Sequence, residues 1–430
     1  MNLKDINKPV CSGRHLGGQG SQTGLISNSE QTTGFYLQGR DWIMNQRNIV
    51  ILFISIVIAM LGYGMAYTVL PFFIEEMGGG GAQFGTLLFL FGLMQLLFAP
   101  VWGKVSDKHG RRPVLVVGMI GLCSAMVFFG FATEIWMLYV AQVGSGILSS
   151  AMLPVSMAYI SDSSSEDSRS GAMGKIGAAA GLGIIIGPGF AGLLAGISLT
   201  FPFFVAAGFC LLTCITILLL LPESLPPEKR SETLEKITLM EVRGMGQALY
   251  TPIALALIIA FAINFGKSNF TGAYAFFAAG RFGFGTEEVG TILMVTGLIY
   301  ALAQGLVVGP LTKKLGEGGV IKLSLAGSAA GFYLMLLAVD YVTMLVTVGL
   351  FNLFNALLKP STMALISKKT TITQGSAMGI AESYMSLGRM IGPLWAGYML
   401  DINLNLPYIS GAVLFLVVFL VSLVLKDKLR

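Results

Sequence analysis

The hydrophobic residues of this chain are gathered into long runs that short polar stretches separate. A helix needs about 20 residues to cross the ~30 Å hydrocarbon core of a bilayer. Runs of this order cover residues 48–71, 84–102, 114–132, 135–160, 171–196, 202–221, 252–279, 288–309, 320–338, 341–366, 376–400 and 408–425. We therefore predict twelve transmembrane helices.

The runs are continuous and rich in glycine, without alternation of apolar and polar residues. Lipid leaves only helices and closed barrels as structures that satisfy every backbone polar group, and barrel strands require that alternation. We therefore expect an all-α membrane protein. Composition agrees, because only 11% of the residues are charged, against about 25% in soluble proteins.

Positive charge is distributed unevenly over the connections between the runs. Counting alternate connections, 23 of the 27 Lys and Arg residues lie on one side, here termed the basic face, which includes segments 103–113 and 222–250. The opposite side, the acidic face, carries Glu75, Glu76, Glu134, Glu287, Glu288, Asp340 and Asp401. Since cytoplasmic loops hold the excess of Lys and Arg, we expect a multi-pass plasma-membrane protein with both termini in the cytoplasm.

The longest internal polar segment, 222–250, divides the chain into two predicted six-helix bundles, 48–221 and 251–430. Its charge-alternating stretch can form a surface helix. Residues 1–47 are polar and rich in Gly, Ser and Gln, so we expect a disordered cytoplasmic tail. The alternative is that translation starts at Met44, directly before the first helix.

The two halves are repeats of each other. The segment that begins at Leu153 matches the one that begins at Lys359, at a shift of 206 residues that later becomes 205. Matching positions include Pro154 and Pro360, Ala172 and Ala377, Gly187 and Gly392, and Pro188 and Pro393. Two parallel six-helix repeats are typical of transporters that rock around a site at the membrane midplane.

The loop at residues 103–113 reads Gly-Lys-Val-Ser-Asp-Lys-His-Gly-Arg-Arg-Pro. It resembles the loop signature of the major facilitator superfamily, G-x-L-x-D-[RK]-x-G-R-[RK], with Val105 in place of the usual Leu. The resemblance implies a gating role for Gly103, Asp107, Lys108, Gly110, Arg111 and Arg112. Asp107 would pair with basic groups and with a neighbouring helix N-terminus, which holds one access state shut.

A second motif, Gly-Ile-Ile-Ile-Gly-Pro-Gly-Phe-Ala-Gly, begins at Gly183 inside the fifth predicted helix. It resembles the antiporter motif of the twelve-helix drug–proton antiporters, a group that includes tetracycline and norfloxacin exporters. The matching positions are Gly183, Gly187, Pro188 and Gly192. Within the superfamily, this resemblance favours export over uptake.

The chain also departs from that group. Val140 stands where many members carry an arginine, and Thr271 and Asn355 stand where some carry acidic residues. Proton coupling through these positions is therefore not expected.

Four ionisable residues lie away from the ends of the predicted spans: Lys267, Lys359, Glu382 and Arg389. Each costs about 2.5–3.5 kcal/mol at the centre of a membrane helix, roughly 10 kcal/mol for all four, so we expect them to face the bundle interior as a charge network. Glu382 and Arg389 are separated by ~10 Å of helix rise, so a pair between Glu382 and Lys359 is favoured over a direct one with Arg389.

Two interpretations of this network stay open. The charges can simply hold helices together, with Lys359 reaching toward the membrane surface, or Glu382 can be the protonatable carboxylate of the transport cycle. Lys267 has no carboxylate in its own helix and can attract an anionic group of a substrate.

By resemblance, polar residues on cavity-lining helices are candidates for the substrate cavity: Tyr63, Tyr67, Gln142, Asn264, Tyr274, Asn352 and Asn355. Other kinds of site are not expected. The only histidines are His15 and His109, so a metal site is not expected, and no cofactor is implied. No basic stretch with interleaved aromatic residues indicates nucleic-acid binding, and no nucleophile–base pair at bilayer depth indicates an enzyme.

These observations predict a secondary active transporter, monomeric in the lipid bilayer, that uses alternating access for proton-coupled efflux of small organic compounds or drugs. The alternative is a facilitator-type exporter of a specific metabolite, sugar or organic anion without the usual proton coupling.

Overall fold

A computed structural model describes the backbone of residues 24–164, 166–231, 246, 248–251, 253–370 and 373–424, and every regular element within these ranges is helical. The chain separates into two compact units, Met1–Arg47 and Asn48–Arg430. The first half contains α1 (Gly24–Glu76), α2 (Gly81–His109), α3 (Arg111–Phe131), α4 (Ile135–Ser149), α5 (Met152–Ser163), α6 (Glu166–Ala195) and α7 (Phe201–Leu220).

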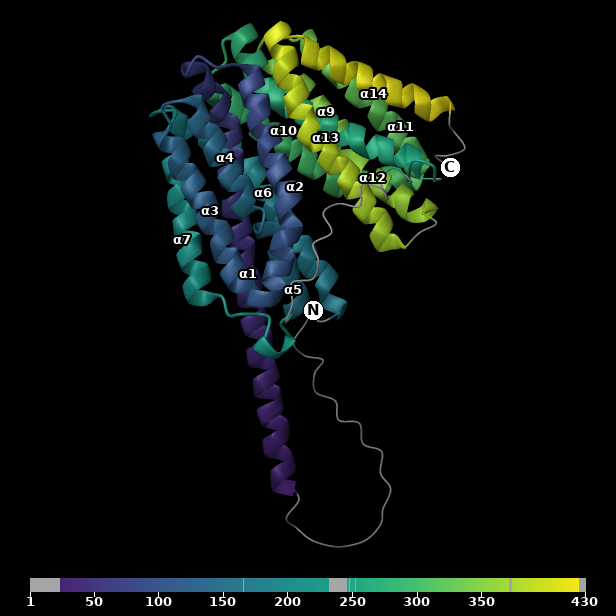
Figure 1. Ribbon diagram of the computed structural model, residues 1–430. Helices are drawn as coiled ribbons and strands as arrows, with labels where there is room; N and C mark the ends of the chain where they lie inside the picture. Colours follow the sequence, from purple (N-terminus) through teal and green to yellow (C-terminus); the bar gives the residue numbers. More distant parts are fainter. Residues whose placement is uncertain are drawn as a thin grey trace. The chain divides into compact units, whose positions relative to one another are not determined.

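The second half follows the short helix η1 (Pro227–Lys229). It contains α9 (Ala254–Phe282), α10 (Thr286–Leu302), the π-helical segment η2 (Ala303–Val307), α11 (Val308–Leu336), α12 (Tyr341–Lys369), α13 (Gln374–Ile402) and α14 (Leu406–Val424). Figure 1 shows these helices as two neighbouring groups within Asn48–Arg430. Most of the stretch predicted as a surface helix lies outside the described residues.

Ten helices in the described ranges are long and apolar enough to cross a membrane. One of these, Thr286–Leu336, has 51 residues and contains two predicted spans, because Gly316 breaks it with a φ of 70° that glycine tolerates. Helix α13 is not among the ten, since Glu382 and Arg389 lower its hydropathy. Both parts of the long helix together with α13 account for the twelve predicted spans, and the all-α membrane fold is confirmed.

Two predicted segments differ in detail. The span predicted at 135–160 consists of α4 and α5, because Pro154 has no N–H to offer the carbonyl of Ser150 four residues earlier. Helix α1 already begins at Gly24, inside the segment expected to be a disordered tail. Extension of an existing helix adds one hydrogen bond per residue and avoids the free-energy cost of nucleating a new helix. A polar sequence can therefore continue α1.

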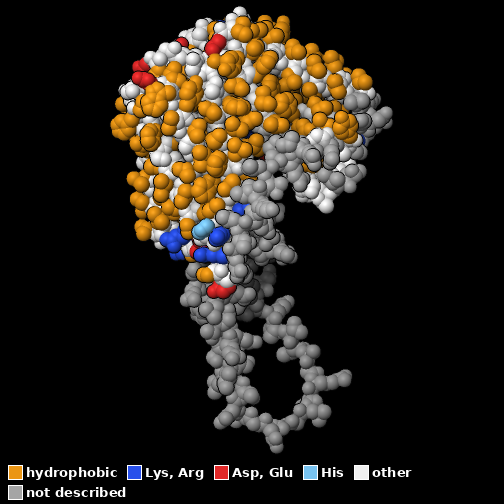
Figure 2. All heavy atoms as spheres, viewed as in Figure 1, with side chains coloured by type: hydrophobic (Ala, Val, Ile, Leu, Met, Phe, Trp, Pro, Cys, Tyr) orange, Lys and Arg blue, Asp and Glu red, His pale blue; other side chains and the backbone are white. Residues whose placement is uncertain are grey.

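Buried hydrophobic side chains form two large clusters, one in each half. The first contains residues between Ile49 and Leu221, and the second contains residues between Ala248 and Val418. Hydrophobic side chains also cover much of the outer surface in Figure 2, between carboxylates at the upper end and basic groups lower down. A surface of this kind suits the hydrocarbon of a bilayer.

The π-helical segment η2 explains a feature of the repeat. Gly85 matches Gly290 at a shift of 205, whereas Gly103 matches Gly309 at a shift of 206. The extra residue of the second half lies between these positions, where Ala303–Val307 adopts π-helical geometry. A π-bulge accommodates one added residue within an otherwise regular helix, so the repeats stay in register on either side of it.

The two bundles meet closely on the acidic face. Helix α2 contacts α13, and α6 contacts α10. A Cβ atom added to Gly85 would lie 2.4 Å from the carbonyl oxygen of Pro393, and one added to Gly290 would lie 2.3 Å from that of Pro188. These two contacts are equivalent under the repeat, and both bring helix backbones together.

Replacement of Gly85 or Gly290 by valine should therefore prevent the acidic face from closing, since the added Cβ collides with backbone. We expect increased labelling of a cysteine placed at Tyr67 by a membrane-impermeant thiol reagent added on the acidic side. Gly208→Val is the control, because nothing lies within 4 Å of a Cβ at that position. Equal labelling of all three variants would contradict the prediction.

Candidate functional site

The loop between α2 and α3 is organised around the guanidinium group of Arg111, which is only 7% exposed. Its Nη1 atom lies 2.5 Å from Asp107 Oδ1 and donates to Ser106 Oγ at 2.6 Å, and its Nε donates to Asp162 Oδ2 at 2.9 Å. Arg111 thereby joins the ends of α2, α3 and α5. In this conformation Asp107 is paired within its own bundle.

A carboxylate from the other end of the first half completes the loop. Glu223 accepts hydrogen bonds from the backbone amides of Arg111 (2.8 Å) and Arg112 (3.2 Å), which open α3. Its Oε1 also accepts from the amides of Ser224 and Leu225. Glu223 is therefore an N-terminal cap of α3, supplied from beyond α7, and a carboxylate is favourable at that end of a helix.

Gly110 permits this arrangement. Its φ of 101° lies in the left-handed region, which favours glycine, and a Cβ there would lie 2.4 Å from Glu223 Oε2. The sequence prediction did not single out Glu223 as a site residue. The only signal was the Leu-Pro-Glu-Ser stretch at 221–224, and nothing local connects it with a loop more than a hundred residues earlier.

The second half contains an equivalent ion pair with reversed charges. Lys368 pairs with Glu317, and these positions match Asp162 and Arg111 at the shift of 206. In each half the pair joins the loop to the end of the helix that contains the repeat proline. Of the predicted gating residues, Gly103 joins the network through its carbonyl, which accepts from Ser106 Oγ at 2.6 Å, whereas Lys108 lies outside the network formed by the described residues.

The antiporter motif in α6 presents backbone to both of its neighbours. A Cβ at Gly183 would lie 2.4 Å from the carbonyl oxygen of Val57, and one at Gly187 would lie 2.9 Å from the Cα of Gly64, both in α1. One at Gly192 would lie 2.8 Å from the carbonyl oxygen of Thr286 in the other bundle. The motif thus packs α6 between α1 and α10.

The intramembrane charges form a chain across α12 and α13. Glu382 Oε1 accepts a hydrogen bond from Arg389 Nη2 at 2.9 Å, and its Oε2 lies 3.7 Å from Lys359 Nζ. The expected pair with Lys359 is present, but the preference against Arg389 was wrong, because the long arginine side chain spans the two helical turns. All three side chains are between 42% and 49% exposed.

Next to this cluster, α13 packs against α2 of the other bundle, since a Cβ added to Gly92 would lie 3.6 Å from the Cα of Met390. Lys267 lies apart from the cluster in α9. Its ammonium group is 3.9 Å from the centre of the Tyr300 ring in α10, directly before the π-helical segment. Tyr300 was not predicted as a site residue, since a cation–π contact between two helices leaves no pattern in the sequence.

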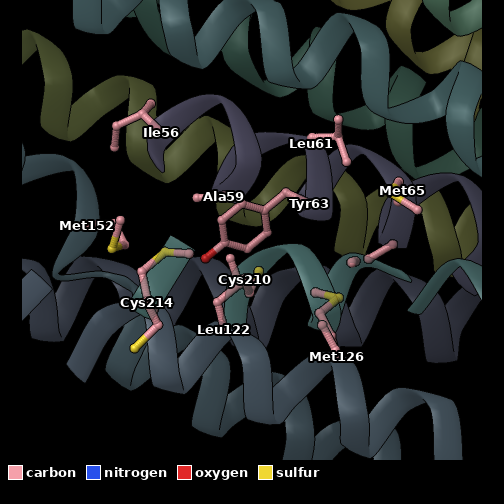
Figure 3. Packing of buried hydrophobic residues seen from close by; sticks show 14 of the residues in the cluster. Ile56, Ala59, Leu61, Tyr63, Met65, Leu122, Met126, Met152, Cys210 and Cys214 are labelled. Carbon is pink, nitrogen blue, oxygen red and sulfur yellow. The ribbon is translucent and has the colours of Figure 1, made fainter. Parts of the chain in front are cut away.

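Most predicted cavity residues are buried in packing contacts instead. Tyr63 points from α1 toward Cys210 and Met152 in the core of the first bundle (Figure 3) and hydrogen-bonds Ser149. The other nearly or fully buried candidates are Gln142, Tyr274, Asn352 and Asn355. Only Tyr67 and Asn264 are partly exposed. Resemblance assigns whole helices to a cavity, whereas packing decides which side of each helix is accessible.

Known proteins match most of the length of this chain. The family model described as Major Facilitator Superfamily matches residues 52–304 and 256–429. The chain is 30% identical to Multidrug resistance protein 2 of Bacillus subtilis, over 90% of this chain and 97% of that protein. It is also 30% identical to the class E tetracycline resistance protein of Escherichia coli, over 81% and 86% of the two chains.

A solved structure of the nucleoside transporter NupG superposes with a TM-score of 0.74 at 13% identity. The superposition covers 88% of this chain and 98% of the NupG chain. This similarity supports the fold.

Removal of the Glu223 carboxylate should destabilise the first bundle, because the amides that open α3 lose their acceptor. We expect Glu223→Ala to lower the free energy of unfolding in detergent by about 1–2 kcal/mol. Glu228→Ala, at an exposed position five residues later, is the control. An equal loss for both variants would contradict the capping role.

Proposed function

Because the chain belongs to the major facilitator superfamily and is therefore a membrane transporter and not an enzyme, we propose that it exports small organic compounds in exchange for protons. Relatives that are named as multidrug and tetracycline resistance proteins support export. We place it in the plasma membrane as a monomer, with the basic face and both termini in the cytoplasm. The two bundles are residues 48–221 and 251–430.

Transport then proceeds by alternating access. The acidic face is closed by helix backbones that meet at Gly85 and Gly290, while the side chains of Glu382 and Arg389 are about half exposed. With the basic face in the cytoplasm, this conformation is open to the inside. Rocking of the repeats would close the basic face, through the loop at 103–113, and open the acidic face.

The observation that carries proton coupling is the position of Glu382 between two cations. It is the only carboxylate of the charge cluster, and its two oxygens contact Arg389 and Lys359 separately. A proton on Glu382 removes the charge that both cations bind, which frees their side chains and lets α12 and α13 separate. Release of the proton on the other side restores the cluster, so proton movement is coupled to the change of conformation.

The Glu382→Gln variant tests this coupling. In proteoliposomes with an imposed pH gradient, accumulation of ethidium, tetracycline or norfloxacin should fall by more than about tenfold. Exchange driven by a substrate gradient alone should persist, because the amide mimics the protonated carboxyl group.

The matched control is Glu317→Gln. Among the described residues of the second bundle, Glu317 forms the other Glu–Lys pair, with Lys368, and it lies in a loop region outside the charge cluster. This variant should retain pH-driven accumulation. Undiminished pH-driven transport by Glu382→Gln would refute Glu382 as the coupling site.

A second candidate function is export of organic anions, and Lys267 favours it. Of the four ionisable residues Lys267, Lys359, Glu382 and Arg389, three are cations and one is a carboxylate, and Glu382 is already shared by two of the cations. Stacking of Lys267 on Tyr300 contributes about 0.5–2 kcal/mol, less than the cost of a charge at bilayer depth. A bound anionic group would neutralise it.

Comparison of Lys267→Gln with Arg281→Gln tests this second function. Both cations lie in α9 and stack on aromatic rings, but Arg281 is in the last turn, on the acidic face. Counterflow of carboxyfluorescein should fall at least about fivefold in Lys267→Gln only, whereas counterflow of ethidium should not. Equal losses for the two dyes would assign Lys267 to packing.

A further inference from the structure

Helices α2 and α13 form a reciprocal pair. Each has 29 residues, and they run in opposite directions across the interface between the bundles. Helix α2 begins on the acidic face and ends on the basic face, whereas α13 begins on the basic face and ends on the acidic face. Each carries a carboxylate in its last turns, Asp107 in α2 and Asp401 in α13.

At the acidic end, the carboxylate of one bundle caps a helix of the other. Asp401 Oδ1 accepts a hydrogen bond from the amide of Gly81 at 2.9 Å, and Oδ2 accepts from the amide of Ala82 at 3.2 Å. These amides open α2. The backbones approach closely as well, since a Cβ at Gly81 would lie 2.7 Å from the carbonyl oxygen of Gly397.

Helix α2 supplies no carboxylate of its own for these two amides, and its Gln83 Oε1 accepts instead from the amide of Gly80 at 3.0 Å. Its N-cap residue, Gly80, has no side chain to offer, and its first turn contains no acidic residue. The unpaired amides and the helix dipole give this end partial positive charge, which a carboxylate stabilises. When the bundles separate on this face, water replaces Asp401 and this stabilisation is lost.

At the basic end, a helix N-terminus without a side-chain cap and a carboxylate are also present, but the carboxylate is bonded elsewhere. The first turn of α13 also contains no acidic residue, and its N-cap, Thr373, makes no side-chain capping bond. The nearest equivalent of Asp401 is Asp107, whose carboxylate is paired with Arg111 of its own bundle at 2.5 Å. It is therefore available for the N-terminus of α13 only in another conformation.

From this arrangement we propose that Asp401 is a latch that holds the acidic face closed and acts in opposition to Asp107. The proposal rests on alternating access. Because both latches connect the same two helices at opposite ends, one is engaged when the other is released. The interface between α6 and α10 has no equivalent latch, since the residue that matches Asp401 is Gly196, directly after the end of α6.

Distance measurements on spin-labelled full-length protein in nanodiscs test the latch. Labels at Thr133 and Tyr333 report the acidic face, and labels at Gly171 and Gly309 report the basic face, after replacement of the four native cysteines. Asp401→Ala should raise the ratio of acidic-face-open to acidic-face-closed molecules roughly five- to thirtyfold, and Asp401→Asn should raise it less. Asp107→Asn should change the ratio in the opposite direction.

Asp340→Ala is the matched control. Asp340 also caps a helix N-terminus on the acidic face, but that helix is its own α12, where it accepts from the amide of Thr343 at 2.8 Å. Hydrogen bonds from Thr343 lower the pKa of Asp340. Its removal should leave the ratio unchanged.

The outcomes separate the latch from the transport mechanism. An equal shift for Asp401→Ala and Asp340→Ala, with two exchanging populations present, would overturn the latch alone. If the unsubstituted protein never opens one face as the other closes, with ethidium or a change of pH, alternating access fails and the latch with it. A shift confined to the Asp401 variants supports the latch.

Discussion

Direct approach of helix backbones on the acidic face is the constraint on which the rest of this structure depends. Side chains cannot fill the contacts at Gly85 and Gly290, where carbonyl oxygens of the partner helices occupy the space of a Cβ. In lipid, helix association relies on close packing and polar contacts, because hydrocarbon tails give no hydrophobic driving force. Small residues at these points therefore let two otherwise independent bundles form one transporter.

The sequence predicted those features that follow from hydropathy and from internal repetition. The helical membrane fold and the superfamily were both confirmed, and comparison of the repeats places an extra residue between Gly290 and Gly309, where the π-helical segment η2 accommodates it. A count of apolar helices alone gives ten, since α13 carries charge and since Thr286–Leu336 contains two spans. The sequence nevertheless predicted a span at 376–400 from its apolar run, and the repeat pairs this span with the apolar span of α6.

Tertiary contacts could not be predicted in the same way. From helical rise alone, Glu382 and Arg389 were expected to be too far apart to pair. The extended arginine side chain nevertheless brings Arg389 Nη2 to 2.9 Å from Glu382 Oε1. Glu223 and Asp401 cap helices distant in sequence, so no local pattern indicates them. Conversely, the tyrosine at position 63 is buried among sulfur-containing and aliphatic side chains, although its helix was assigned to the cavity.

The length of α2 and α13 has a mechanical consequence. A helix of 29 residues is ~43 Å long, so a pivot near its middle leaves arms of roughly 21 Å. A tilt of only about 2° moves each tip by ~0.7 Å, enough to stretch the Asp401 bonds beyond hydrogen-bonding distance. Small tilts thus break the contact completely, and such a lever favours two discrete positions over a continuum.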